Sequence, residues 1–311
     1  MMDRPTLAIC YIHFVAFSLR TFSQILSDVQ SARAWYNSIG ISTDGTRLEL
    51  IEKRLAAFLA DLTSEPAEKV VGRWSKADTY YVLSDGAAFG SIAREIARVG
   101  PNLMPKKSLR VLLEGPLNPE DEIPGDESVN ARNVFTELEL AAYFSERGIT
   151  PTGFGDLKFR FKKVTYSLQC KRLLSASRVE ENVEKAYDQL KGDLTTDKDR
   201  GLIALAVDKL MRLEGKIYRV KNESEVTSEV YRLTDEFKKT FGAAWAKFID
   251  TRVTGILVIF RFLCHTAKLN VIGPAYYVDI LPLVSEQTLQ ASDLFRLRGV
   301  VSRLSGSLTR E

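Results

Sequence analysis

The chain has 311 residues, with 43 Lys and Arg against 40 Asp and Glu, so its formal net charge is +3. Hydrophobic residues make up 45% and charged residues 27% of the chain, which excludes collagen-like, low-complexity and wholly disordered proteins. At roughly 150 residues per domain, this length predicts two domains.

Cysteine and histidine are scarce, which limits the disulfides and metal sites that the chain can form. Three cysteines and two histidines are too few and too scattered for a disulfide framework or a zinc cluster. We therefore expect a reducing compartment, with a cytoplasmic localisation as the default.

The apolar run over residues 6–19 is bounded by Arg4 and Arg20 and is shorter than the ~20 residues that a membrane-spanning helix needs. We interpret it as a buried or partly disordered N-terminus and expect no membrane partner. A signal peptide is the alternative, although no small-residue cleavage site follows the run.

The first hundred residues are predicted to be mostly helical. Apolar residues recur at three-to-four spacing and predict helices over 17–39, 46–62 and 87–99. The glycines at 86 and 90 are interpreted as a plain turn before the third of these helices. We assign 1–115 to a mostly helical N-terminal region and 116–130 to an acidic, proline-rich linker.

The second half of the chain predicts an α/β domain over 131–311. A helix over 131–146 ends near Gly148, which suits a left-handed C-terminal cap. The elements expected after it are strands over 156–161 and 164–171, a helix over 178–192, a strand over 202–207, further helices between 209 and 250 (notably 224–239), strands over 256–263 and 271–281, and a short helix over 292–304.

The first two strands of this domain predict a hairpin with two distinct faces. If Lys162 and Lys163 form the turn, paired positions sum to 325, so Phe159 faces Tyr166 and Asp156 stands opposite Gln169. Because side chains alternate along a strand, one face is an apolar layer. The other face brings a carboxylate, a carboxamide and the amine of Lys171 to one end of the hairpin.

This combination has a chemical use. A hard cation such as Mg²⁺ binds oxygen ligands and keeps several waters, so Asp156 and the Gln169 oxygen would suffice beside a substrate phosphate. Lys171 would orient or deprotonate the attacking water and offset phosphate charge. Glu137 or Glu139, on the preceding helix, would add a third oxygen, and helical periodicity does not choose between them.

The order of these features resembles the PD-(D/E)xK nuclease superfamily, whose fold is called restriction-endonuclease-like. The resemblance covers residues 131–208 and rests on a Glu-x-Glu helix, Gly148, Gly155–Asp156, a hairpin and Gln169-Cys170-Lys171, followed by a helix and a strand. Gly155 stands where the motif has proline, and Gln169 replaces its acidic residue. The second change removes one negative charge, which would weaken metal binding and in some relatives accompanies lost catalysis.

The resemblance implies an αβββαβ core, Mg²⁺- or Mn²⁺-dependent hydrolysis of phosphodiester bonds, with DNA as the expected substrate, and catalytic roles for Asp156, Gln169 and Lys171. A residue on the following helix often approaches the site in such nucleases, which adds Gln189 as a candidate. Cys170, between Gln169 and Lys171, is included with the metal-site positions, although strand alternation turns it toward the apolar face. A homodimer, or a larger defence or repair complex, is a further expectation of the same kind.

Residues 131–178 hold nine Lys and Arg against four acidic residues, a surplus that suits phosphate contacts. It could equally be a solvated sheet edge, where lysines discourage edge pairing. The candidate nucleic-acid-binding residues are Lys158, Arg160, Lys162, Lys163, Arg172 and Arg178.

Two other functions compete with a nuclease. One is a catalytically inactive, nuclease-like module that binds nucleic acid without a metal. The other is a protein-interaction scaffold, built on the charged helices between 209 and 250 and on the N-terminal apolar stripe.

Overall fold

The computed structural model describes residues 21–65, 69–70, 73, 76–100, 104–118, 127–153, 157–213, 216–221, 223–246, 248, 252–266, 271–283 and 289–301. The apolar N-terminal run, with Cys10 and His13, lies outside these residues, as does Asp156. Within the described ranges, no helix combines the length and the apolarity that a membrane-spanning segment requires.

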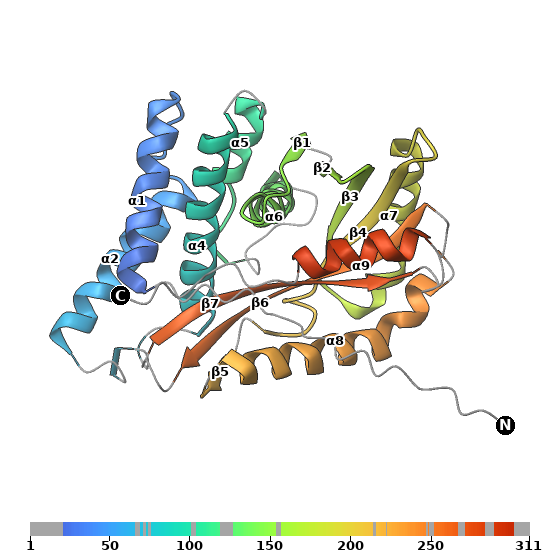
Figure 1. The fold of residues 1–311 in the computed structure, drawn as a ribbon. Coiled ribbons are helices and arrows are strands. Elements are labelled where there is room, and N and C mark those ends of the chain that lie inside the picture. Colours follow the sequence, from blue (N-terminus) through green and yellow to red (C-terminus); the bar gives the residue numbers. More distant parts are fainter. Residues whose placement is uncertain are drawn as a thin grey trace.

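The N-terminal region is helical, as predicted. It contains α1 (Phe22–Ser38), α2 (Arg47–Ser64), α4 (Lys76–Val99) and α5 (Lys106–Leu113) (Figure 1). α1 begins at a capping box in which Thr21 and Gln24 satisfy each other's backbone N–H groups. α4 is much longer than the predicted 87–99, so the turn expected at residues 86–90 is wrong: both glycines lie inside a helix.

Close packing against α1 explains a glycine in the middle of α4. A Cβ atom built on Gly90 would lie 2.6 Å from the Cβ of Asp28. Glycine therefore lets the two helices approach, although it costs helix propensity.

We expect Gly90→Ala to lower the free energy of unfolding by about 1–3 kcal/mol, because α1 must move away from α4. Gly299→Ala is the matched control, since a Cβ there meets nothing within 4 Å. It should leave stability unchanged or raise it by up to about 1 kcal/mol. Urea denaturation of both variants measures the difference, and equal stabilities would contradict the packing explanation.

A mixed sheet forms the centre of the second half, which confirms the α/β class. Its strands are β1 (Pro151–Gly153), β2 (Leu157–Phe161), β3 (Val164–Arg172), β4 (Asp199–Ala206), β5 (Ile217–Val220), β6 (Val253–Thr266) and β7 (Val271–Pro282). The path through the sheet is β1-β2-β3-β4-β6-β5, and β7 pairs with β6. β2 and β7 run antiparallel to their neighbours, whereas β3, β4 and β6 are parallel.

The hairpin register is confirmed. β2 and β3 pair Leu157 with Leu168 and Phe161 with Val164, so each pair sums to 325. Lys162 adopts a left-handed backbone with φ of 55°, which closes the Lys-Lys turn. Two strands were not predicted: β1, which contains Pro151 and Gly153, and β5, four residues long.

β4 and β5 share one edge of β6. β4 pairs with the first half of β6, through Ile259, and β5 pairs with its last four residues, Leu263–Thr266. Between them the Tyr80 hydroxyl of α4 donates a hydrogen bond to the Arg261 carbonyl, at 3.2 Å. The N-terminal helices thus satisfy a backbone group of the sheet.

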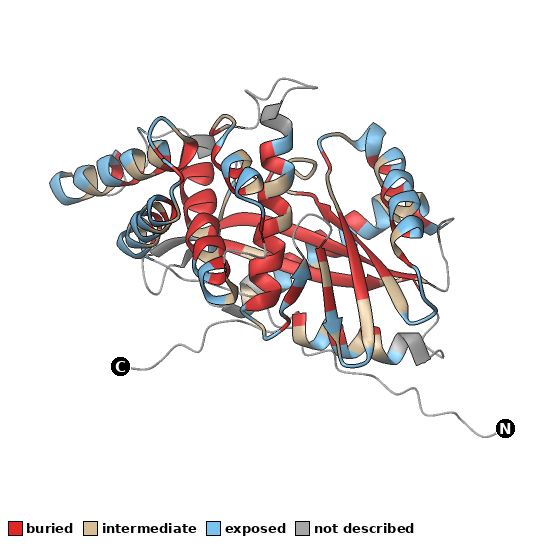
Figure 2. Ribbon diagram, turned by 90° about the horizontal axis from the view of Figure 1, so that it is seen from above, coloured by how far each residue is buried: buried red, intermediate tan, exposed pale blue. Residues whose placement is uncertain are grey.

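Helices cover both faces of the sheet. α7 (Val179–Asp193) and α8 (Glu223–Ala246) pack on one face, whereas α6 (Glu127–Ser145) and α9 (Leu289–Val301) pack on the other. α8 and α9 lie on opposite sides of β6 and β7 in Figure 1. Figure 2 shows the buried residues concentrated in the strands and on the inward sides of the helices.

The N-terminal helices share their core with the second half of the chain. Their apolar cluster includes Phe135 and Leu138 of α6 and Leu263 of β6. The Phe89 and Phe135 rings, from α4 and α6, lie 5.0 Å apart between centroids. α6 itself begins at Glu127, four residues before the predicted start, inside the segment assigned to the linker.

Candidate functional site

The polar face of the β2–β3 hairpin lies under α7. Gln169 and Lys171 are paired in register with Ile203 and Leu205 of β4, whose side chains belong to the core beneath α7 and α8. Ser167 and Gln169 are buried. The predicted alternation of faces is therefore confirmed, but α7 covers part of the polar face: Gln169 is buried, Lys171 is half-buried and Gln189 is exposed.

Three elements bring the polar side chains of this site together. The Lys171 Nζ donates a hydrogen bond to the Gln189 Oε1 at 2.6 Å. The Gln169 Nε2 donates to the Asp193 Oδ2 at 3.3 Å, and the other Asp193 oxygen lies 3.9 Å from the Nζ of Lys158. β2, β3 and α7 thus contribute two amines, two carboxamides and one carboxylate. We call these five residues the α7–hairpin site.

Asp193 is the site residue that sequence reasoning missed. It follows Gln189 by four positions, which places both side chains on one face of α7. The helical spacing was therefore a usable signal. Because a carboxylate only accepts hydrogen bonds, Asp193 fixes the Gln169 carboxamide with its nitrogen toward the helix.

Other predicted site residues lie elsewhere. Asp156 is outside the described residues. Glu137 and Glu139 belong to α6, on the opposite face of the sheet from Gln169 and Lys171, and the structure does not bring either to the α7–hairpin site. Cys170 also faces α6, and burial together with nearby Glu137 raises its thiol pKa well above its usual value.

Glu139 belongs to a buried polar cluster between α6 and the sheet. Its carboxylate forms an ion pair with Arg261 of β6, and both side chains are under 10% exposed. A second buried pair joins Asp85 of α4 to Arg132 of α6 at 2.9 Å. Burial raises the Glu139 pKa to about 8, against the opposing charge of Arg261. This cluster explains why Glu139 is turned away from the hairpin.

The candidate nucleic-acid contacts spread along β3. Arg160, Lys162 and Lys163 are exposed at the turn of the hairpin, and Arg172 and Arg178 lie at or just beyond the other end of β3. The nine residues of β3 span roughly 30 Å at ~3.3 Å each. The α7–hairpin site lies between these two groups. One of the nine basic residues counted in the sequence, Arg132, is buried and paired, so it adds nothing to the surface charge.

The donor set of this site suits a hard cation. Its potential ligands are the Asp193 carboxylate and the carboxamide oxygens of Gln169 and Gln189, all oxygens, and Mg²⁺ usually needs only one or two carboxylates beside water and substrate phosphates. Among the described residues, no group of three or more His, Cys, Asp and Glu side chains gathers in a metal-binding arrangement. These residues therefore do not form a site that coordinates a metal ion by protein ligands alone.

Comparison with known proteins does not identify the chain. No protein-family model matches it, and no curated protein matches its sequence. Its function therefore has to be inferred from the fold and from the α7–hairpin site.

Proposed function

We propose that the protein is a metal-dependent nuclease that hydrolyses phosphodiester bonds, with DNA as the substrate. The observation that carries the proposal is the convergence of Gln169, Lys171, Gln189 and Asp193 in one site. Sequence patterns alone predict three of these four, Gln169, Lys171 and Gln189, as site residues. A site for phosphate chemistry needs a carboxylate that can bind a metal ion and an amine that can stabilise phosphate charge, and this site has both.

The order of elements around the site supports the same proposal. α6, three antiparallel strands, α7 and the parallel strand β4 follow one another as the αβββαβ order requires. The restriction-endonuclease-like assignment remains part of the proposal, because many α/β proteins share helices on both faces of a mixed sheet.

Each residue has a chemical role in this proposal. Asp193 would hold a Mg²⁺ or Mn²⁺ ion, together with Asp156, which the sequence predicts as a ligand. The Gln169 carboxamide, whose nitrogen now faces Asp193, would turn its oxygen toward the ion. The bound ion would polarise the phosphate and lower the pKa of a coordinated water. Lys171, held in place by Gln189, would stabilise the charge that develops on the phosphate. Lys158 would contact the same group from β2.

The basic residues would bind the phosphates of the nucleic acid on either side of the cleaved bond. A track of roughly 30 Å, from the hairpin turn to the end of β3, is close to the ~34 Å of one duplex turn. Positive side chains at both ends of the track would position a backbone across the site by phosphate contacts, which carry no sequence information.

The test is cleavage of plasmid and single-stranded DNA with Mg²⁺ or Mn²⁺. We expect Lys171→Met to reduce the cleavage rate by at least about 100-fold, the usual effect of losing one stabilising group. Lys185→Met is the matched control, because Lys185 lies on the same face of the sheet but pairs with Glu181 at the α7 surface, at 2.6 Å. Circular dichroism establishes that both variants fold.

The outcomes separate the competing functions. Cleavage that survives Lys171→Met contradicts the site assignment. Salt-sensitive DNA binding without cleavage or Mn²⁺ binding identifies the inactive nucleic-acid-binding module. If the protein does not bind DNA at low salt, the protein-interaction scaffold is the remaining function of the three.

A further inference from the structure

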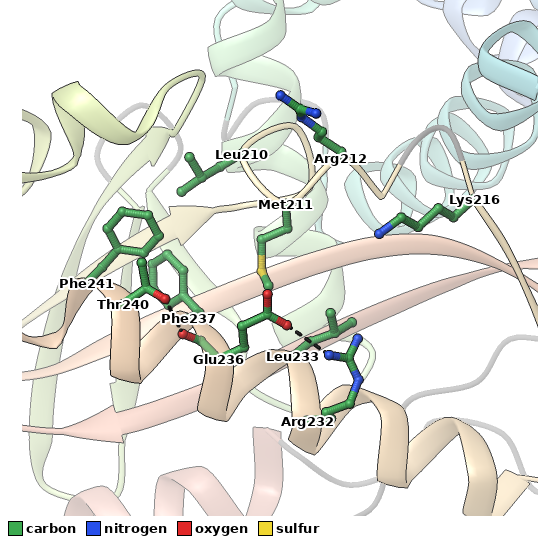
Figure 3. Close-up of a pocket in the computed structure, with 10 residues that line it drawn as sticks. All are labelled: Leu210, Met211, Arg212, Lys216, Arg232, Leu233, Glu236, Phe237, Thr240 and Phe241. Carbon is green, nitrogen blue, oxygen red and sulfur yellow. Dashed lines mark hydrogen bonds and ion pairs between the residues drawn. The ribbon is translucent and has the colours of Figure 1, made fainter.

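A cavity of about 310 Å³ lies between α8 and the loop that follows β4 (Figure 3). Its size falls within the range of small-ligand sites. It is found beyond the carboxyl end of a parallel strand, which is where open α/β sheets bind their ligands. None of its lining residues belongs to the α7–hairpin site.

One side of the cavity is apolar and aromatic. The rings of Phe237 and Phe241, on α8, lie 5.2 Å apart between centroids and are tilted by 44°. Phe237 is buried and Phe241 half-buried, and Met211 reaches from the loop opposite (Figure 3). A flexible thioether facing aromatic rings suits a flat, apolar ligand group.

The other side of the cavity carries unbalanced positive charge. Glu236, on α8, accepts a hydrogen bond from Arg232 at 2.9 Å, but Arg232 also donates to Glu229 at 2.6 Å. These three residues therefore carry a net charge of −1, which the two cations of the loop opposite exceed by one. Lys216 and Arg212 lie on the loop, are exposed, and make no side-chain hydrogen bond or ion pair within the described part of the chain. In Figure 3 the Lys216 amino group points toward Met211, whereas the Arg212 side chain extends away from Met211 and the α8 side chains. This charge favours an anion.

The loop is held in a strained conformation. Arg212 adopts φ of 54°, which is unusual and strained for a residue other than glycine. Backbone hydrogen bonds from Met211 to Val207 and from Leu213 to Asp208, both 2.9 Å, close the loop around it. These hydrogen bonds hold residues 207–213 in one conformation, and a preorganised segment of this kind lowers the entropic cost of binding a ligand.

We propose that this cavity binds a nucleoside monophosphate, with the base against Phe241 and the phosphate beside Lys216. The aromatic and cationic chemistry comes from the cavity itself. The choice of a nucleotide over other aromatic anions rests on the proposed function, because complete phosphodiester hydrolysis releases mononucleotides. The cavity would then sense or retain the product at a distance from the hydrolytic residues.

The experiment is calorimetric titration of the full chain at low salt with AMP, CMP, inorganic phosphate and benzoate. We expect both mononucleotides to bind, and to bind at least tenfold more tightly than phosphate or benzoate. Lys216→Met should weaken nucleotide binding by at least about tenfold through loss of a charge-assisted contact. Phe241→Ala should weaken it by a similar factor through loss of stacking.

Lys239→Met is the control, since Lys239 is an exposed lysine of α8 outside the cavity. It should bind nucleotides as the unmodified protein does. Equal affinity for benzoate and AMP, or unchanged affinity in both cavity variants, would overturn the proposal.

Titration of the Lys171→Met protein without metal separates this inference from the nuclease proposal. Nucleotide binding retained by that variant supports the cavity whether or not the chain cleaves DNA. If nucleotide binding is lost in Lys171→Met and kept in Lys216→Met, the nucleotide binds at the α7–hairpin site and the cavity proposal is wrong.

Discussion

Removing the carboxylate of Asp193 is expected to abolish specific Mn²⁺ binding. Loss of an outer contact to a metal ligand typically costs 10- to 100-fold in affinity, so loss of a direct ligand should weaken Mn²⁺ binding by at least about 100-fold in Asp193→Asn. DNA cleavage should fall in parallel. The reason is geometric: Asp193 lies 3.3 Å from Gln169 and supplies, from α7, the negative charge that the β3 position lacks.

An exchange of the two groups tests this explanation directly. In the double variant Gln169→Glu/Asp193→Asn, a carboxylate and a carboxamide still face each other, with their positions reversed. Mn²⁺ affinity should return to within about tenfold of the original protein, because charge and contact are both kept. Isothermal titration calorimetry provides the readout independently of cleavage.

Asp188→Asn is the matched control, since Asp188 is an exposed carboxylate of α7 that is not one of the five residues of the α7–hairpin site. It should bind Mn²⁺ normally. Full Mn²⁺ affinity in Asp193→Asn would remove Asp193 from the metal site while leaving the roles of Lys171 and Gln189 open to the cleavage assay.

The second large effect concerns the buried pair of Arg261 and Glu139. Arg261→Met should lower the free energy of unfolding by about 3–5 kcal/mol at pH 9, because it leaves a buried carboxylate without its partner. The loss should be smaller at pH 6. Burial raises the Glu139 pKa from 4.5 to about 8, so near pH 6 the carboxyl is already protonated and needs no compensating charge.

The sign of this pH dependence follows from proton binding. Between about pH 4.5 and 8 the folded protein binds more protons at Glu139 than the unfolded chain, so this residue's contribution to stability is lost as the pH rises. Without Arg261 the pKa rises further and the decline extends to higher pH. Urea denaturation at pH 6 and pH 9 measures the two losses.

The double variant Glu139→Leu/Arg261→Met provides the control for this prediction. Replacing both charges by apolar side chains should recover most of the stability at pH 9, since buried ion pairs are often no better than apolar packing. Equal losses at the two pH values in Arg261→Met would show that the cost comes from packing against Phe135 and not from the carboxylate.

Local rules predict the hairpin and its two faces. Strand alternation and a two-residue turn are sufficient to pair Phe159 with Tyr166 and to place Gln169 and Lys171 together. The same rules miss β1 and β5, because strands of three and four residues carry too little periodic signal, and β1 contains proline and glycine.

Tertiary contacts decide what local rules leave open. Helical periodicity places Glu137 and Glu139 near the border of the apolar face of α6, but it does not show that α6 packs on the opposite face of the sheet from the site. Nor does it show that Glu139 pairs with Arg261, more than 120 residues later in the chain. The glycines of α4 suggest a turn until the packing of α1 is known. Asp193 can be predicted from the sequence, because it follows Gln189 by four positions and therefore lies on the same face of α7.

The arrangement of β6 has a kinetic consequence. The antiparallel pairs β2–β3 and β6–β7 join segments that are adjacent in sequence, so they close short loops at little entropic cost. β6 also pairs in parallel with β4, which ends 47 positions earlier at Ala206, and this pairing requires β5 and α8 to be looped out. Folding should therefore be slow and limited by long-range contacts at the centre of the sheet, with the two hairpins forming early.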